Sequence, residues 1–118
     1  MKVYCNHLVI ADKVNIVDTF MKRFFGLMGK KKLDFGEGLF LLNCPSIHCF
    51  FMKIPIDVIY LSEELTVVGM ETLKPWSIGK HYRGTAHVLE LREGSVNSKV
   101  NLGDRIVLSR EEVNGRRK

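Results

Sequence analysis

The most constraining feature of the sequence is the stretch His48–Leu61, which contains the densest apolar run in the chain. Pro55 divides this stretch, because proline has no amide hydrogen to give to a central β-ladder and therefore lies at a bend or at the start of a strand. Alternation of side chains then predicts two strands, over about residues 47–53 and 56–61. Both faces of these strands are largely apolar, so we expect the rest of the chain to cover them on both sides.

Two charged residues, Lys53 and Asp57, interrupt this apolar stretch. Charged side chains are rarely buried without a partner. One interpretation is a Lys53–Asp57 ion pair near the bend at Pro55. The other is a pocket in which the two charges face a ligand, and the residues alone leave both interpretations open.

The remaining apolar runs predict that the chain is mainly β, with one main helix. Residues 2–17 fit an opening hairpin that turns near Ala11-Asp12-Lys13. Apolar residues at helical spacing predict the main α-helix near residues 18–28, and a short helix is expected near residues 95–100. The other predicted strands are residues 39–43, 65–73, 86–92 and 105–108, with a turn at Ser62-Glu63-Glu64 before the second of them.

Several short motifs occur in an order that resembles a known family. The central one is Phe50-Phe51-Met52-Lys53 followed by Pro55-Ile56-Asp57-Val58, and the others are Arg23-Phe24-Phe25-Gly26-Leu27-Met28, Gly36-Glu37-Gly38-Leu39, Val88-Leu89-Glu90-Leu91 with Gly94, and Gly103-Asp104-Arg105. Together they cover about residues 18–108 and resemble the family known as domain of unknown function 192. The chain departs from the family pattern at Ile54, which alone separates Lys53 from Pro55 where many members have a longer polar connector. The resemblance implies a compact β-sandwich or barrel of jelly-roll type with a short helix, and it implies no established activity.

Length and composition point to a single domain. The chain has 118 residues, and we predict one globular domain over residues 1–109. Residues 110–118 are predicted to be a flexible basic tail, because Val113 is their only apolar residue. No apolar run approaches the roughly 20 residues that span a bilayer. We therefore expect no membrane contact. The three cysteines lack the paired spacing of a disulfide framework, so we also expect a cytoplasmic protein.

The formal net charge of +5 raises the question of nucleic-acid binding. Lys30, Lys31 and Lys32 contribute +3, and the residues after Ser109 contribute four basic against two acidic side chains, or +2. The rest of the chain is formally neutral, which disfavours a nucleic-acid-binding face. The alternative is a platform for single-stranded nucleic acid in the irregular loop 74–84, which combines aromatic and basic side chains: Trp76, Lys80, His81, Tyr82 and Arg83.

The sequence contains no familiar catalytic or cofactor motif. The P-loop, Gly-x-Gly-x-x-Gly and Gly-x-Ser-x-Gly patterns are absent. His48 and Cys49 are neighbours, but adjacent side chains of a strand point to opposite faces, so the two do not form a nucleophile–base pair. The histidines and cysteines lack the short paired spacings of structural zinc sites. We therefore expect no metal and no cofactor, and an enzyme of unknown reaction is kept as an alternative.

The strongest candidate site is a set of polar residues placed among apolar strands at positions that match the family motifs: Arg23, Glu37, His48, Lys53, Asp57, Trp76 and Glu90. They form either a structural network, in which Asp57 pairs with Lys53 or Arg23 and Trp76 covers the core, or a ligand pocket at the mouth of the sandwich. We predict a non-enzymatic ligand-binding or accessory domain whose partner is an unknown small molecule or peptide. No feature of the sequence favours a particular oligomeric state.

Overall fold

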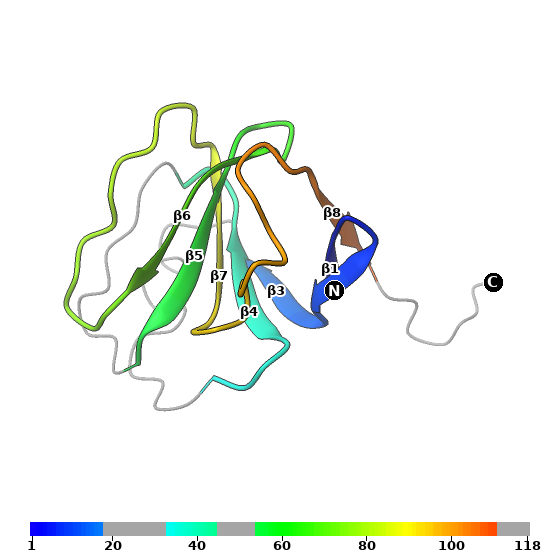
Figure 1. The fold of residues 1–118 in the computed structure, drawn as a ribbon, viewed down its shortest axis with the longest axis horizontal. Helices are drawn as coiled ribbons and strands as arrows, with labels where there is room; N and C mark the ends of the chain where they lie inside the picture. Colours follow the sequence, from blue (N-terminus) through cyan, green and yellow to red (C-terminus); the bar gives the residue numbers. More distant parts are fainter. Residues whose placement is uncertain (18–32, 45–53, 111–118) are drawn as a thin grey trace.

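The computed structural model describes residues 1–17, 33–44 and 54–110, which form two β-sheets and contain no helix (Figure 1). The strands are β1 (Lys2–Cys5), β2 (Leu8–Ala11), β3 (Lys13–Val17), β4 (Glu37–Leu41), β5 (Ile56–Leu61), β6 (Val67–Leu73), β7 (His87–Arg92) and β8 (Ile106–Ser109). The predicted β-rich fold is therefore confirmed. Across the same residues, no helix is long and apolar enough to cross a membrane.

The two sheets differ in size and in strand direction. The smaller sheet has the order β2-β1-β8 and the larger one the order β3-β4-β7-β5-β6. All neighbours pair antiparallel except β3 and β4, which are parallel. Jelly rolls are built from antiparallel strands, so this pair departs from the connectivity that the family resemblance implied.

The inner strands of the five-stranded sheet are buried on both faces, as the apolar pattern of residues 56–61 predicts. Every residue of β5 is buried, and Pro55 immediately precedes this strand. The inner face, which includes Ile59 and Leu89, packs against Val3 and Ile106 of the smaller sheet. The outer face carries a separate apolar cluster, which includes Ile56, Val58 and Tyr60 of β5. The predicted strand 47–53 lies outside the described residues.

The opening hairpin exists, but its predicted turn near residues 11–13 is wrong. The turn lies at Asn6-His7, between β1 and β2, and both residues have positive φ, of 53° and 68°. A two-residue turn with this geometry matches the right-handed twist of the flanking strands, and asparagine tolerates it well. Asp12 instead links the two sheets, since β2 belongs to one and β3 to the other.

The predicted short helix near residues 95–100 is also wrong, because this segment forms turns and bends. Asn97 and Ser98 have φ of 31° and 64°, whereas an α-helix needs φ near −63°. The amides of Gly94 and Val96 donate to the side chain of Asp57 and so hold the segment in a turn. The predicted main helix near residues 18–28 lies outside the described residues.

Candidate functional site

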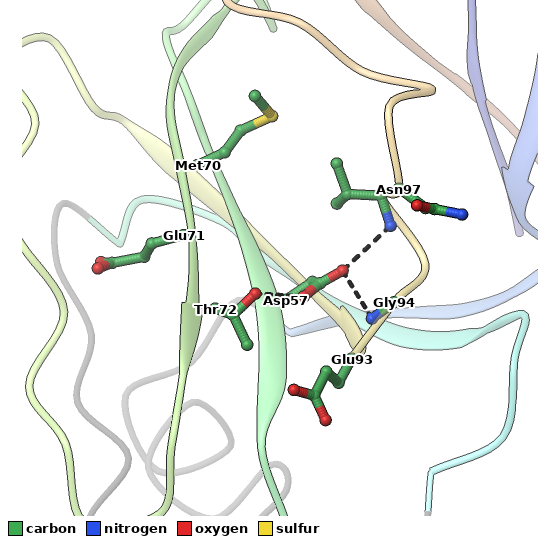
Figure 2. A pocket seen from close by; sticks show the side chains of 8 residues that line it. Asp57, Met70, Glu71, Thr72, Glu93, Gly94 and Asn97 are labelled. Atoms are coloured by element: carbon green, nitrogen blue, oxygen red, sulfur yellow. Dashed lines mark hydrogen bonds between the residues drawn. The ribbon is translucent and has the colours of Figure 1, made fainter.

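An open pocket lies between β6 and the turn formed by residues 93–97 (Figure 2). Its volume is about 370 Å³. The lining residues come from three consecutive positions of β6, from one position of β5, and from the 93–97 turn: Asp57, Met70, Glu71, Thr72, Glu93, Gly94, Val96 and Asn97. We call this cavity the acidic pocket, because three of its lining residues are carboxylates and none is basic.

Asp57 forms the floor of the acidic pocket and is only 5% exposed. The register of β5 and β6 places it opposite Thr72, on the same face of the sheet. The Thr72 hydroxyl donates to Asp57 Oδ1 at 2.8 Å, and the amides of Gly94 and Val96 donate to Oδ2 at 3.0 and 3.1 Å. A carboxylate offers about four acceptor positions, so three are used and one remains on Oδ1.

The wall of the pocket opposite β6 depends on this carboxylate. Gly94 has φ of 92°, a conformation that glycine adopts without the steric cost of a side chain. Its amide and that of Val96 converge on one oxygen of Asp57, as the dashed lines in Figure 2 show. Asp57 thus holds the segment after β7 to the neighbouring strand β5, so the turn is positioned by a side chain of a different strand.

Two glutamates at the rim of the acidic pocket, Glu71 and Glu93, differ in their position relative to Asp57. Figure 2 shows the Glu93 carboxylate beside the pocket and the Glu71 carboxylate pointing away from Asp57. Glu71 Oε2 accepts from the Tyr60 hydroxyl at 2.6 Å and from the amide of Lys80 at 2.8 Å. Glu71 therefore contributes negative potential from behind the strand, while Asp57 and Glu93 are the carboxylates that a ligand would meet.

With the geometry in place, comparison with known proteins identifies the family. Residues 6–108 match the family model DUF192, which is described as "Uncharacterized ACR". The chain belongs to the DUF192 family. The resemblance found in its motifs is thereby confirmed.

Relatives of this DUF192 protein include two from archaea. The UPF0127 protein of Pyrococcus furiosus is 35% identical over 105 residues, which cover 86% of this chain and 90% of that protein. The UPF0127 protein of Pyrococcus abyssi is 40% identical over 101 residues, covering 80% and 84%. A crystal structure of a protein of unknown function from Novosphingobium aromaticivorans has a TM-score of 0.80 with 20% identity, covering 92% of this chain and 84% of that one. At this identity the likeness shows the fold alone.

The described residues of the predicted site do not meet in one place. Asp57 pairs with Leu91 while Glu90 pairs with Val58, so the two carboxylates lie on opposite faces of the sheet. Glu37 Oε1 accepts from the Asp34 amide at 2.8 Å and holds the turn before β4. Trp76 is 61% exposed, so most of its side chain faces solvent. Arg23, His48 and Lys53 lie outside the described residues.

Glu90 is the buried carboxylate of the outer face. It is 8% exposed, and its cross-strand neighbours are Val58 and Leu39. Within residues 1–17, 33–44 and 54–110 no hydrogen bond to its carboxylate is found, and burial raises its pKa to about 7. Desolvation disfavours the charged form of an acid, which accounts for the direction of this shift.

The residues of the nucleic-acid alternative in the segment 80–83 are not equally available. Lys80, His81 and Arg83 are exposed, whereas Tyr82 is partly buried against the sheet. The Tyr82 ring lies 4.6 Å from that of Tyr60, centroid to centroid, and covers Gly69, where any side chain would collide with it. The Tyr82 hydroxyl donates to the Met70 carbonyl, and burial, followed by the charge of Glu71, raises its pKa. One face of this ring is thus already occupied by protein.

Sequence reasoning missed Thr72, Glu93, Gly94 and Asn97 as pocket residues. A signal for Gly94 existed, since glycine after an apolar strand marks a turn whose amides can bind a carboxylate. Thr72 carries no such signal, because only the strand register brings it to Asp57. As for metals, the part of the chain that the structure describes contains no group of three His, Cys, Asp or Glu residues arranged to hold an ion.

Proposed function

We propose that this DUF192 protein is a non-enzymatic binding domain whose acidic pocket takes a small organic molecule with an ammonium or guanidinium group. The observation that carries the proposal is the state of Asp57. Its carboxylate is fixed by three donors and keeps one acceptor position on Oδ1, at the floor of an open pocket that has no basic lining residue. A ligand cation supplies the missing fourth donor.

The pocket supports this ligand class in charge and in shape. Charge-assisted hydrogen bonds from a cation to a carboxylate are among the strongest in proteins, and a preorganised acceptor requires no rearrangement on binding. Glu93 adds a second negative charge at the rim, while Met70 and Val96 offer apolar contact to a short carbon chain. The pocket is negative although the whole chain carries +5, so it attracts cations against the background of the molecule.

The same geometry favours an organic cation over a metal ion. Calcium and magnesium take six or more oxygen ligands, and Asp57 has a single acceptor position left. The Glu71 carboxylate is bound to Tyr60 and Lys80, on the far side of the strand. An ammonium group needs only one well-placed carboxylate and a second negative charge nearby.

A titration with two isosteric probes tests the proposal. We expect n-butylammonium to shift the amide resonances of Gly94, Val96 and Thr72, and n-butanol at the same concentration to leave them unchanged. Glu93→Gln removes one rim charge at an exposed position, and we expect it to weaken binding by about 3- to 10-fold, or roughly 0.7–1.4 kcal/mol. Glu63→Gln, in the β5–β6 turn, is the matched control and is expected to leave the affinity unchanged.

Equal shifts from butanol and butylammonium would contradict the proposal, because apolar contact would then account for the binding. The same holds if Glu93→Gln and Glu63→Gln weaken binding equally, since a general loss of negative charge would explain both. Binding to the acidic pocket should also weaken with added salt, because the Debye length falls from about 10 Å at 0.1 M to 3 Å at 1 M.

A further inference from the structure

A second cavity lies on the other side of the 93–97 turn. Its volume is about 290 Å³. One wall is the edge of β2 and the other is formed by the Phe35-Gly36 turn and the segment after β7: Val9, Ile10, Ala11, Asp12, Phe35, Gly36, Gly94, Ser95 and Lys99. We call it the β2 groove. It shares only Gly94 with the acidic pocket, so the two cavities are separate.

The β2 groove contains a buried hydroxyl without a hydrogen-bond partner. Ser95 is 5% exposed, and its Oγ has no partner within the described part of the chain. Buried polar groups are nearly always hydrogen-bonded, so such an atom at a cavity wall calls for an explanation. The backbone on either side of Ser95 is fixed by Asp57, which binds the amides of Gly94 and Val96. Ser95 is therefore kept in the wall of the groove.

The opposite wall offers unpaired backbone groups. β2 is an edge strand of the smaller sheet, and the two-residue turn at Asn6-His7 makes Cys5 and Leu8 the hydrogen-bonded pair. Tyr4 and Val9 then form the next pair, which is not hydrogen-bonded. The N–H and C=O of Val9 therefore point away from β1. Among the described residues, no other backbone group bonds to them. An open strand edge of this kind is a template for another strand.

We propose that the β2 groove binds an extended peptide segment, which adds as a strand to the outer edge of β2 and hydrogen-bonds to the Ser95 hydroxyl. A peptide backbone presents donors and acceptors in alternation, which matches the N–H and C=O of Val9 on one wall and a hydroxyl on the other. The charges of the groove balance, with one Asp12 and one Lys99, so a neutral main chain suits it better than an ion. Val9 and Phe35, 44% and 59% exposed, give apolar contact to alternate side chains.

The probe for this site is the capped pentapeptide acetyl-Thr-Val-Thr-Val-Thr-amide, titrated into the full chain and followed by amide NMR. We expect shifts at Val9, Ile10 and Ser95. Two isomers sharpen the test, one N-methylated at both valines and one at the first and the central threonine. Strand addition uses a single edge of the peptide, so one isomer is expected to bind and the other to lose binding.

A pair of matched variants tests the hydroxyl. Ser95→Ala is expected to lower the affinity for the peptide about 3- to 10-fold, as for the loss of one hydrogen bond. Ser109→Ala changes the same side chain at the end of β8, the other edge of the same sheet, and is expected to have no effect. Should Ser95→Ala fold poorly, the two N-methylated isomers on the unaltered chain still decide the question.

Three results would overturn the proposal. The first is absence of binding at millimolar peptide, and the second is equal binding or equal loss for both N-methylated isomers. The third is concentration-dependent self-association that protects the Val9 amide, which would assign the edge to a second copy of the chain. Glu93→Gln is expected to leave the peptide affinity unchanged, so failure of this site and failure of the acidic pocket are separable.

Discussion

Among residues 1–17, 33–44 and 54–110, each face of the five-stranded sheet buries one carboxylate, and the two faces stabilise it in different ways. Asp57 on the inner face and Glu90 on the outer face are 5% and 8% exposed. They sit in adjacent strands, offset by one residue in the β5–β7 register. Asp57 accepts three hydrogen bonds, whereas the structure shows none to Glu90 within the residues it describes. Two carboxylates with similar burial therefore differ in the number of hydrogen-bond donors that stabilise their charge.

The difference comes from what each face packs against. The 93–97 turn approaches the inner face at Asp57 and brings two backbone amides with it. Glu90 has Val58 and Leu39 as cross-strand neighbours, and neither side chain offers a donor. A buried carboxylate without donors pays the full desolvation cost, so its pKa rises to about 7. The comparison predicts that removing the two charges has effects of opposite sign.

The largest expected effect is that of Asp57→Ala. This change leaves the Thr72 hydroxyl and the amides of Gly94 and Val96 without their acceptor, and we expect a loss of about 3–5 kcal/mol in unfolding free energy. Asp57→Asn keeps one acceptor oxygen but turns an NH2 group toward the other donors, so a smaller loss is expected. Urea unfolding measures both. A rise of the urea midpoint in Asp57→Asn would show instead that the carboxylate is strained and would undo the contrast with Glu90.

The second effect concerns Glu90 and depends on pH. The pKa of Glu90 in the folded protein, about 7, lies above its ordinary value of 4.5. The folded state thus holds the proton more tightly, so the contribution of Glu90 to stability is highest below pH 4.5, falls as the pH rises toward 7, and stays low above it. Glu90→Gln lacks this titration. Its stability relative to the unaltered chain should improve between pH 4.5 and pH 8 by an amount on the order of 3 kcal/mol.

The measurement for Glu90 is a series of urea unfolding curves over that pH range. Glu64→Gln, at an exposed position in the β5–β6 turn, serves as the control and should show no such change. If the difference between Glu90→Gln and the unaltered chain is the same at pH 5 and pH 8, the outer face supplies compensation for Glu90 and the two faces are alike.

The sequence could predict the parts of this contrast that depend on neighbouring residues, but not those that depend on residues far apart in the chain. The bounds of β5 were predicted because alternation and Pro55 are local signals, and β5 is Ile56–Leu61 as expected. Asp57 stood out for the same reason, as a charge in an apolar strand. Its donors did not, because they are backbone amides 37 and 39 residues away: Gly94 marks a turn, but nothing local tells which carboxylate the amides of that turn will meet.

The grouping of Asp57 and Glu90 into one site failed for a related reason. Motif order says which residues belong to a family, but strand register decides which face each side chain takes, and a shift by one residue exchanges the faces. The turn at Asn6 is a different case, since asparagine is itself a local signal for positive φ. The prediction of a turn near residues 11–13 did not use this signal. Local signals were therefore available for turns and strand bounds, and long-range pairing was needed for the site.

The smallest effect, Thr72→Val, sharpens the account of the inner face. The change is nearly isosteric and removes only the hydroxyl that donates to Asp57 Oδ1 at 2.8 Å, so we expect a loss of about 1 kcal/mol in unfolding free energy. It also frees a second acceptor position on Oδ1, so the affinity for n-butylammonium should rise while stability falls. Thr66→Val, in the same hairpin but outside the pocket, is the control for both measurements. A fall in both quantities would mean that Thr72 shapes the pocket rather than competing with the ligand for Asp57, and it would leave the backbone donors of the turn as the sole basis of the contrast between the two faces.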